Sequence, residues 1–285
     1  MEDSSVPNKI EDLEYQRSIK ITQFGKNGRR EIDDIVLVEK PVDIFINSKP
    51  LANIISLPKN LKELAIGFTF SIGLINSVTD VDEILIDRSK FKVELSLKNK
   101  DLDPTTIDIN SVNRVVETSC GISSPWRDYI KKALQDIDKN ERKTDNIRIP
   151  VQTIHHTIVN MQKNTSLFKE TGGCHGAGIF DLKGYKICVM EDIGRHNAID
   201  KAIGYLLLHH KKSEDLILTT TGRLTGDCVL KAIRANIPII ASLSAAIESS
   251  IRLAYIYGIT LIGFVRGTRM NVYTNPNRIQ YNSEK

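Results

Sequence analysis

One cysteine of the chain lies in a segment that could carry out sulfur chemistry. Cys120 follows Thr118 and Ser119 and precedes Gly121, and the surrounding residues show no apolar periodicity that would bury a thiol. In an exposed loop the thiolate, which is the nucleophilic form of cysteine, can take a group from one partner and hand it to another. These residues alone leave open the simpler interpretation, a cysteine that is merely tolerated in a loop.

Three further loops combine glycine with charged or hydrogen-bonding side chains. Residues 171–178 read TGGCHGAG, and glycines let backbone N–H groups approach a ligand closely. Residues 191–197, EDIGRHN, lead into a predicted helix, whose positive end favours an anion. Residues 219–227, TTTGRLTGD, repeat the order of strand, glycine turn and helix. A turn, a helix cap or a salt bridge would explain each loop singly, but two such helix-starting loops in one sheet favour a binding cleft.

A fourth loop, residues 264–269, ends the last predicted strand and places two arginines around a glycine. Arginines in this arrangement can clamp phosphates, although arginines at strand ends are usually only solvated. The residues expected to bind a ligand are Gly172, Gly173, His175, Arg195, His196, Asn197, Gly222, Arg223, Phe264, Val265, Arg266, Gly267, Thr268 and Arg269.

The hydrophobic pattern predicts the elements that must position these loops. Strands are expected over residues 35–47, interrupted at Lys40-Pro41, and over 83–86 and 92–97, with an amphipathic helix over 61–75 between them. After a helix that follows Ile149-Pro150, a hairpin joined through Lys183-Gly184 is expected. From there helices and strands alternate with short connections, which predicts a largely parallel sheet flanked by helices. The predicted elements are helices over 126–137, 151–162, 195–210, 227–236 and 245–257, and strands over 178–181, 185–190, 216–219, 239–242 and 260–265.

Composition excludes several classes of protein. The 285 residues allow one or two domains, and a net charge of +4 is too slight to indicate nucleic-acid binding. No apolar run reaches the ~18 residues of a membrane span, and the polar, acidic start is unlike a signal peptide, so a cytoplasmic location is expected. Four cysteines without a C-x-x-C pair disfavour a zinc knuckle, and none of the six histidines has the H-x-E spacing of a zinc deaminase.

Taken in order along the chain, these loops resemble one family, the formate dehydrogenase accessory sulfurtransferases known as FdhD. The most specific piece is residues 192–201, DIGRHNAIDK, which is close to the family's D-x-G-R-H-N-A-x-D-K. The other matching pieces are Glu39-Lys40-Pro41, KELAIGF over 62–68, Cys120-Gly121, Thr171 to His175, Gly222-Arg223, Lys231-Ala232, Ile237-Pro238 and Gly263-Phe264 with Arg266, Arg269 and Asn271.

The resemblance implies an α/β protein of two domains, usually assembled as a homodimer. The larger domain is expected to be a cytidine-deaminase-like three-layer α/β/α domain without zinc, and the smaller an α+β domain at the N-terminus. The expected organisation is a flexible arm over residues 1–18, the N-terminal α+β domain over 19–115, the cysteine loop and a linker helix over 116–148, and the α/β domain over 149–285.

The resemblance also implies a sulfur carrier. In the family, a cysteine desulfurase loads sulfur as a persulfide onto the residue that corresponds to Cys120, and the sulfur passes to a bis(molybdopterin guanine dinucleotide) cofactor for formate dehydrogenase. Residues 264–269 match the family's cofactor-binding stretch, and Arg266 and Arg269 suit the phosphates of the dinucleotide. The cofactor is cargo, and we expect no protein-ligated metal, nucleic-acid partner or membrane partner. The metal of the cofactor is expected to be either molybdenum or tungsten.

The sequence departs from the family at the cysteine loop. Members often have C-G-x-C-G there, whereas Ser123 replaces the second cysteine in this chain. A carrier that uses one persulfide is still expected, because the terminal sulfur can be transferred without a resolving thiol. Two alternatives remain: a chaperone that binds the cofactor without sulfur chemistry, and a cysteine hydrolase that pairs Cys120 with His175 or His196.

Overall fold

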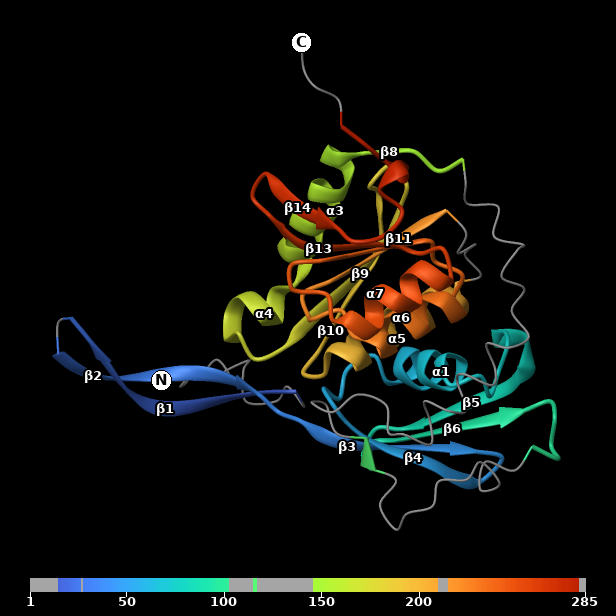
Figure 1. The fold of residues 1–285 in the computed structure, drawn as a ribbon. Helices are drawn as coiled ribbons and strands as arrows, with labels where there is room; N and C mark the ends of the chain where they lie inside the picture. Colours follow the sequence, from blue (N-terminus) through green and yellow to red (C-terminus); the bar gives the residue numbers. More distant parts are fainter. Residues whose placement is uncertain (1–14, 27, 103–114, 117–145, 210–214, 282–285) are drawn as a thin grey trace, which may run out of the picture.

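A computed structural model describes residues 15–26, 28–102, 115–116, 146–209 and 215–281. Cys120 and the predicted helix over residues 126–137 lie outside these ranges. The described residues build an α/β fold with two main sheets, and helices lie between them (Figure 1).

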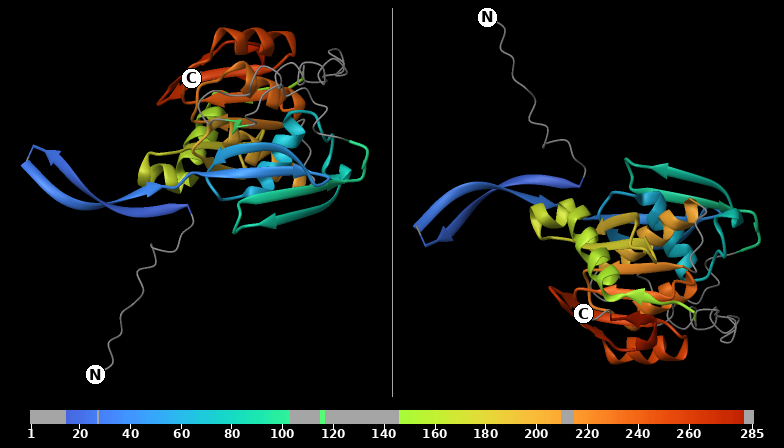
Figure 2. Two further views of the ribbon diagram at one scale, coloured as in Figure 1. Left: turned by 90° about the horizontal axis from the view of Figure 1, so that it is seen from below. Right: turned by 90° about the horizontal axis from the view of Figure 1, so that it is seen from above.

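An antiparallel hairpin precedes the first main sheet. Strands β1 (Gln16–Gly25) and β2 (Gly28–Leu37) pair along their whole length and reach away from the rest of the molecule in both views of Figure 2. Residues 1–18 are interpreted from the sequence as an arm, but β1 begins within that segment. The hairpin escapes the sequence pattern because most of its side chains are exposed, so neither of its faces carries a continuous apolar stripe.

The N-terminal sheet has the strand order β5-β6-β3-β4-β7. Its inner face is apolar because alternate residues of β3 and β6, including Ile44, Val93 and Leu95, point into the core, where they are fully buried. Helix α1 covers this face. The bounds are β3 (Lys40–Ile46), β4 (Lys49–Ser56), α1 (Leu61–Ser71), the 3-10 helix η1 (Val78–Asp80), β5 (Val81–Asp87), β6 (Lys92–Leu97) and β7 (Val115–Val116).

The C-terminal sheet has the strand order β10-β9-β11-β12-β13-β14. Only the pairs β11/β12 and β12/β13 are parallel, so the expectation of a largely parallel sheet is wrong. The predicted hairpin through Lys183-Gly184 is confirmed by β9 and β10, whereas the hairpin of β13 and β14, closed by the short turn after Arg266, was not predicted. The bounds are β9 (His175–Asp181), β10 (Lys186–Asp192), β11 (Leu216–Thr220), β12 (Ile239–Ser242), β13 (Thr260–Arg266) and β14 (Arg269–Val272).

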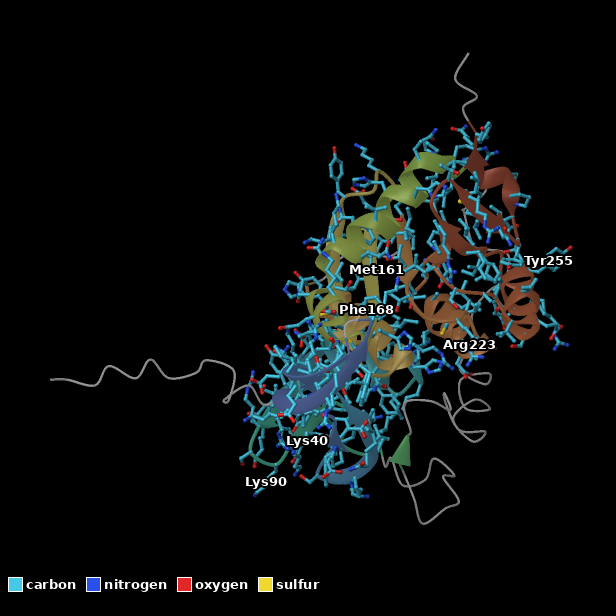
Figure 3. All side chains as sticks on the ribbon, turned by 90° about the vertical axis from the view of Figure 1, so that its left-hand side faces the viewer. Lys40, Lys90, Met161, Phe168, Arg223 and Tyr255 are labelled. Carbon is cyan, nitrogen blue, oxygen red and sulfur yellow. The ribbon has the colours of Figure 1, made fainter. Side chains whose placement is uncertain are left out.

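Helices cover both faces of the C-terminal sheet. On one face, α3 (Val151–Asn164) packs Ile154, Ile158 and Met161 against alternate strand residues; Figure 3 shows Met161 on this helix. On the other face lie α5 (Arg195–Leu208), α6 (Gly226–Arg234) and α7 (Glu248–Ile256). The remaining elements are β8 (Ile149–Pro150), α4 (Ser166–Thr171), η3 (Pro276–Arg278) and β15 (Ile279–Gln280).

Helices α1 and α5 join the two sheets through a very close crossing. A Cβ atom built on Gly67 would lie 1.8 Å from the carbonyl oxygen of Asp200, and one on Gly204 would lie 1.9 Å from the carbonyl oxygen of Glu63. Glycine is therefore required on both helices at this point. None of the helices within the described ranges is long and apolar enough to cross a membrane.

Most of the elements expected from the sequence are confirmed. The helix over 61–75 is α1, and the alternating helices and strands after residue 149 correspond to α3, β9, β10, α5, β11, α6, β12, α7 and β13 within a few residues at each end. The sequence prediction did not include β1, most of β2, β4, α4 or β14.

Candidate functional site

The loops singled out in the sequence meet at one edge of the C-terminal sheet. Strands β10, β11, β12 and β13 run in the same direction, so their carboxyl ends share this edge. Strand β9 runs the opposite way and begins there, with His175 opposite Asp192. This arrangement places the starts of α5 and α6 and the turn after β13 beside the glycine-rich segment before β9. Ligands of α/β proteins commonly bind at such an edge.

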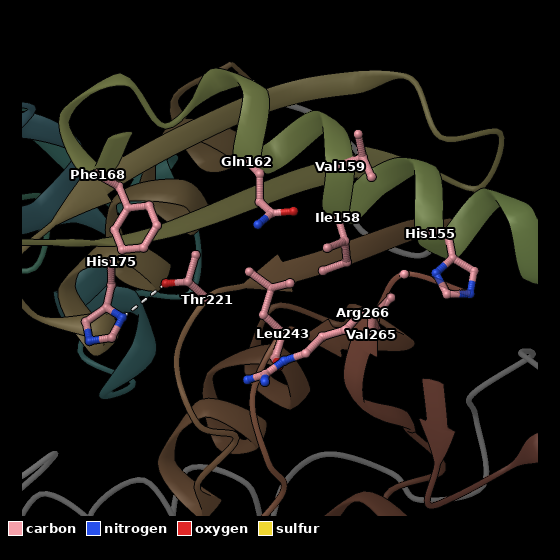
Figure 4. Close-up of a pocket in the computed structure, with 11 residues that line it drawn as sticks. His155, Ile158, Val159, Gln162, Phe168, His175, Thr221, Leu243, Val265 and Arg266 are labelled. Atoms are coloured by element: carbon pink, nitrogen blue, oxygen red, sulfur yellow. Dashed lines mark hydrogen bonds between the residues drawn. The ribbon is translucent and has the colours of Figure 1, made fainter. Parts of the chain in front are cut away.

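A pocket of about 550 Å³ opens between α3 and the ends of β11, β12 and β13 (Figure 4). This volume lies within the range of pockets that bind small molecules and cofactors. In Figure 4, Gln162 and Ile158 point from α3 toward Leu243, and Phe168 and His175 are drawn at one end of the pocket. The lining residues are His155, Ile158, Val159, Gln162, Phe168, His175, Thr221, Leu243, Val265, Arg266 and Gly267.

Arg266 is held at this pocket by the turn that follows β13. Its Nε donates to the carbonyl oxygen of Leu243 at 2.8 Å, and its guanidinium carbon lies 5.9 Å from the centre of the Phe264 ring. Phe264 has φ +51°, an uncommon conformation for a residue with a side chain, and the β13/β14 register shifts between Gly263 and Arg266. The bulge turns Arg266 away from the regular strand pattern, and no partner within the described ranges is found for its two terminal amino groups.

His175 links the pocket to the next loop. Its Nδ1 lies 3.0 Å from the Thr221 hydroxyl, which also accepts from the backbone N–H of Gly176 at 3.1 Å. Burial lowers the pKa of His175, and the nearby Arg195 charge lowers it further, while Asp192 acts in the opposite direction. His175 is therefore a neutral ring at pH 7 that can donate or accept a hydrogen bond.

Arg195 and His196 form a second group, at the amino end of α5. His196 Nε2 lies 3.2 Å from the Thr225 hydroxyl, whereas His196 Nδ1 and Arg195 Nε have no hydrogen-bond partner among the described residues. Gly222 makes room for Arg195, because a Cβ atom at Gly222 would lie 2.8 Å from the Arg195 Cβ. Burial, together with the nearby charges of Lys231 and Arg195, lowers the pKa of His196 to about 3.

Asn197 joins the two sheets instead of facing the open edge. Its Nδ2 donates to the carbonyl oxygen of Ile55 at 2.9 Å and to Asp192 Oδ1 at 3.0 Å. The same carboxylate pairs with Lys201 at 2.6 Å, and both side chains are fully buried. Lys201 also donates to the carbonyl oxygen of Leu57 at 2.9 Å. Part of the motif at 192–201 is therefore a buried polar link between the two sheets.

The other predicted site residues lie around the edge but do not line the pocket. Gly172 has φ +66° and ends α4, since its N–H donates to the carbonyl oxygen of Phe168, and Gly173 follows it in the turn. Arg223 is exposed on the turn before α6 (Figure 3), and Thr268 and Arg269 are exposed on the β13/β14 turn. The pocket residues that sequence reasoning missed are His155, Ile158, Val159, Gln162, Phe168, Thr221 and Leu243.

The three cysteines within the described ranges are poor nucleophiles. Cys174, Cys188 and Cys228 are all buried, and burial raises the pKa of each thiol, to about 12 for Cys174 and Cys188. Among the described residues, no group of three or more His, Cys, Asp or Glu side chains could hold a metal ion. Cys120, the predicted sulfur carrier, lies outside the described ranges, so its geometry relative to the pocket stays a prediction.

The fold and the site together define an α/β protein with a ligand-sized pocket at the carboxyl ends of its parallel strands. The FdhD/NarQ family profile matches residues 37–280 of the chain. The chain belongs to the FdhD/NarQ family.

Relatives and a solved structure agree with this assignment. The chain is 38% identical over 266 residues to "Sulfur carrier protein FdhD" of Sulfolobus acidocaldarius, which covers 92% of this chain and 98% of that protein. It is 32% identical over 262 residues to the protein of the same name from Bacillus subtilis, covering 91% and 96%. A crystal structure of a candidate formate dehydrogenase accessory protein from Desulfotalea psychrophila matches with a TM-score of 0.72 and 27% identity, covering 93% of this chain and all of that one.

Proposed function

We propose that the chain is a sulfur carrier that serves a formate dehydrogenase. The observation that carries this proposal is its similarity, over nine-tenths of its length, to proteins named as sulfur carriers. Cys120 accepts sulfur from a cysteine desulfurase as a persulfide. The terminal sulfur then passes to the bis(molybdopterin guanine dinucleotide) cofactor of molybdenum or tungsten, which is the substrate of this step.

The loading step is a thiol exchange. The Cys120 thiolate attacks the outer sulfur of the persulfide on the desulfurase, a new sulfur–sulfur bond forms on Cys120, and the desulfurase thiolate leaves. Delivery of that outer sulfur as sulfide consumes two electrons, which we assign to a thiol reductant, and returns Cys120 to the thiolate. One cysteine is sufficient for both steps, so Ser123 in place of a second cysteine does not prevent them.

The pocket between α3 and β13 is the proposed binding site for a guanine nucleotide end of the cofactor. Its walls are largely apolar, with the Phe168 ring at one end, and suit a flat heteroaromatic base. Arg266 supplies a positive charge at the mouth, where a phosphate can accept from its free amino groups. The pocket therefore offers one surface for the base and one cation for the phosphates.

Arg266→Gln should weaken binding of GDP, the probe for this end of the cofactor, by about tenfold or more, because a charge-assisted hydrogen bond to phosphate is lost. Isothermal titration calorimetry measures the dissociation constant. The matched control is Arg269→Gln, which removes the same charge directly across the hairpin from Arg266, outside the pocket lining. Arg269→Gln should weaken GDP binding by less than about threefold, as expected for an exposed charge that does not line the pocket. Equal losses in the two variants would contradict the assignment of the pocket.

A second candidate function is a chaperone that binds the cofactor without carrying sulfur, and the missing second cysteine favours it. The two functions differ in their need for Cys120. In cells that lack the native protein, Cys120→Ala should restore no formate dehydrogenase activity, whereas the loop control Ser123→Ala should restore it fully. Full activity with Cys120→Ala would favour the chaperone.

Further features belong to the same proposal. We infer that the N-terminal and C-terminal sheets are the cores of two domains, that the larger is related to cytidine deaminases, and that the chain works as a homodimer in the cytoplasm. The C-terminal sheet lies between α3 and the helices α5 to α7, and this three-layer arrangement supports the relationship to cytidine deaminases.

A further inference from the structure

The amino end of α5 carries hydrogen-bond donors without acceptors within the described ranges. No side chain of the described residues caps this helix, and no acidic residue lies in its first turn. The backbone N–H groups of Arg195, His196 and Asn197 have no acceptor within the described ranges. Unpaired N–H groups and the positive end of the helix dipole together favour an anion.

The buried side chain of His196, in the first turn of α5, also favours a bound anion. His196 is only 7% exposed, yet its Nδ1 has no hydrogen-bond partner in the part of the chain that the structure describes, and neither has Arg195 Nε. Leaving a buried polar atom unpaired costs about 1–3 kcal/mol. Cys228 can donate to the carbonyl oxygen of Arg223, which leaves the Thr225 hydroxyl free to donate to His196 Nε2. In that arrangement Nδ1 carries the proton of His196 and is a donor without an acceptor.

The charges of the site favour a small anion with a single negative charge. The low pKa values keep His196 and His175 neutral at pH 7. Lys201 is paired with Asp192, and Lys231 with Asp200, each at 2.6 Å, so Arg195 is the cation of this group that has no ion-pair partner within the described residues. One guanidinium balances one negative charge, whereas a diphosphate would bring surplus charge into a largely buried place, which is costly.

We propose that the amino end of α5 binds a singly charged sulfur anion, either hydrosulfide or the terminal sulfur of a persulfide. The anion accepts from the first-turn N–H groups, from Arg195 Nε and from His196 Nδ1. The inference rests on the proposed sulfur-carrier function and gives it a second subsite, next to the nucleotide pocket, because His175 lines that pocket and lies within electrostatic reach of Arg195 and His196.

Titration of the Cys120→Ala chain with sodium hydrosulfide tests the site without interference from the carrier cysteine. The probe is the imidazole nitrogen and proton signals of His196 in NMR spectra. We expect a saturable shift at His196 and a dissociation constant raised about tenfold or more by Arg195→Gln. The matched control is Arg252→Gln, which removes an exposed arginine on α7 and should leave the constant unchanged.

Gly222→Ala is the second variant, in case Arg195→Gln fails to fold. The added Cβ displaces the Arg195 side chain without removing its charge, so hydrosulfide should again bind more weakly. The proposal is overturned if His196 shows no saturable shift, if Arg195→Gln and Arg252→Gln bind equally well, or if inorganic phosphate binds at His196 more tightly than hydrosulfide.

A second arm separates the two sources of the anion and isolates the proposed function. The unmodified chain is loaded by a cysteine desulfurase, and the mass of the Cys120 peptide reports the loading. A His196 shift in the loaded chain without free sulfide identifies the persulfide as the ligand, and a shift only with free sulfide identifies hydrosulfide. Loading on Cys120 with no shift in either arm refutes the subsite alone, whereas absence of loading refutes the sulfur carrier itself.

Discussion

Gly204→Ala should destabilise the folded chain by about 4 kcal/mol or more, which is exceptional for a single substitution. A methyl group at this position would lie 1.9 Å from the carbonyl oxygen of Glu63 and 2.9 Å from the backbone nitrogen of Gly67. These are backbone atoms of α1, so the overlap is relieved only by moving the two helices apart. Intrinsic helix propensity acts in the opposite direction, since alanine is preferred over glycine in a helix by about 1 kcal/mol. Urea denaturation followed by circular dichroism measures the change.

Gly25→Ala is the control for this substitution. Gly25 lies at the end of β1, and a Cβ atom there would have no neighbour within 4 Å. The free energy of unfolding should change by less than about 0.5 kcal/mol, as for most surface substitutions. A Gly204→Ala chain as stable as Gly25→Ala would show that α1 and α5 do not cross as closely as described.

Lys231→Met should cost about 3–5 kcal/mol, because it leaves the carboxylate of Asp200 buried without its cation. Lys231 Nζ contacts the two carboxylate oxygens at 2.6 and 2.7 Å, and the Ser71 hydroxyl donates to the same group at 2.7 Å. Burial raises the pKa of Asp200, and Lys231 counteracts that shift. Methionine retains most of the length and the apolar stem of lysine, so the lost charge dominates the effect. Urea denaturation at neutral pH gives the value.

The double variant Asp200→Asn, Lys231→Met separates charge from packing. Asparagine stays neutral and keeps a hydrogen bond to Ser71, so the double variant should be more stable than Lys231→Met alone. A double-mutant cycle then gives the coupling between the two side chains. A Lys231→Met chain within about 1 kcal/mol of the parent would contradict a buried, paired Asp200.

Much of the fold could be predicted from the sequence, because apolar periodicity reports burial. Elements with one buried face, such as α3 and β6, were predicted within a few residues. The β1/β2 hairpin was not predicted, since its exposed strands carry charged residues on both faces. The turn at Lys183-Gly184 predicted the antiparallel pairing of β9 with β10. The antiparallel pairing of β9 with β11 could not be predicted, because periodicity is the same for parallel and antiparallel strands. The C-terminal sheet is mixed, because only its β11/β12 and β12/β13 pairs are parallel.

The candidate site was predictable in part. The loops rich in glycine and arginine predicted three residues that line the pocket, which are His175, Arg266 and Gly267. The sequence did not predict that α3 forms a wall of the pocket, because Ile158, Val159 and Gln162 have the spacing of any amphipathic helix. Only the tertiary structure shows that this helix faces the ends of β12 and β13.

The motif at residues 192–201 combines two roles that its sequence does not separate. Asp192, Asn197 and Lys201 bind one another or backbone carbonyls of the N-terminal sheet segment, so their contribution is structural. Arg195 and His196 retain unpaired polar atoms and are the members free to bind a ligand. Polar residues of both kinds look alike in a sequence, because the burial that distinguishes them depends on the partner sheet.

Transfer of labelled sulfur tests the central claim most directly. The chain is incubated with a cysteine desulfurase and ³⁵S-cysteine, freed of the donor, and then mixed with the pterin guanine dinucleotide cofactor and a thiol reductant. We predict that label resides on the Cys120 peptide after the first step and moves to the cofactor in the second, and that Cys120→Ala carries none. Equal transfer of label by the Cys120→Ala chain would contradict the account.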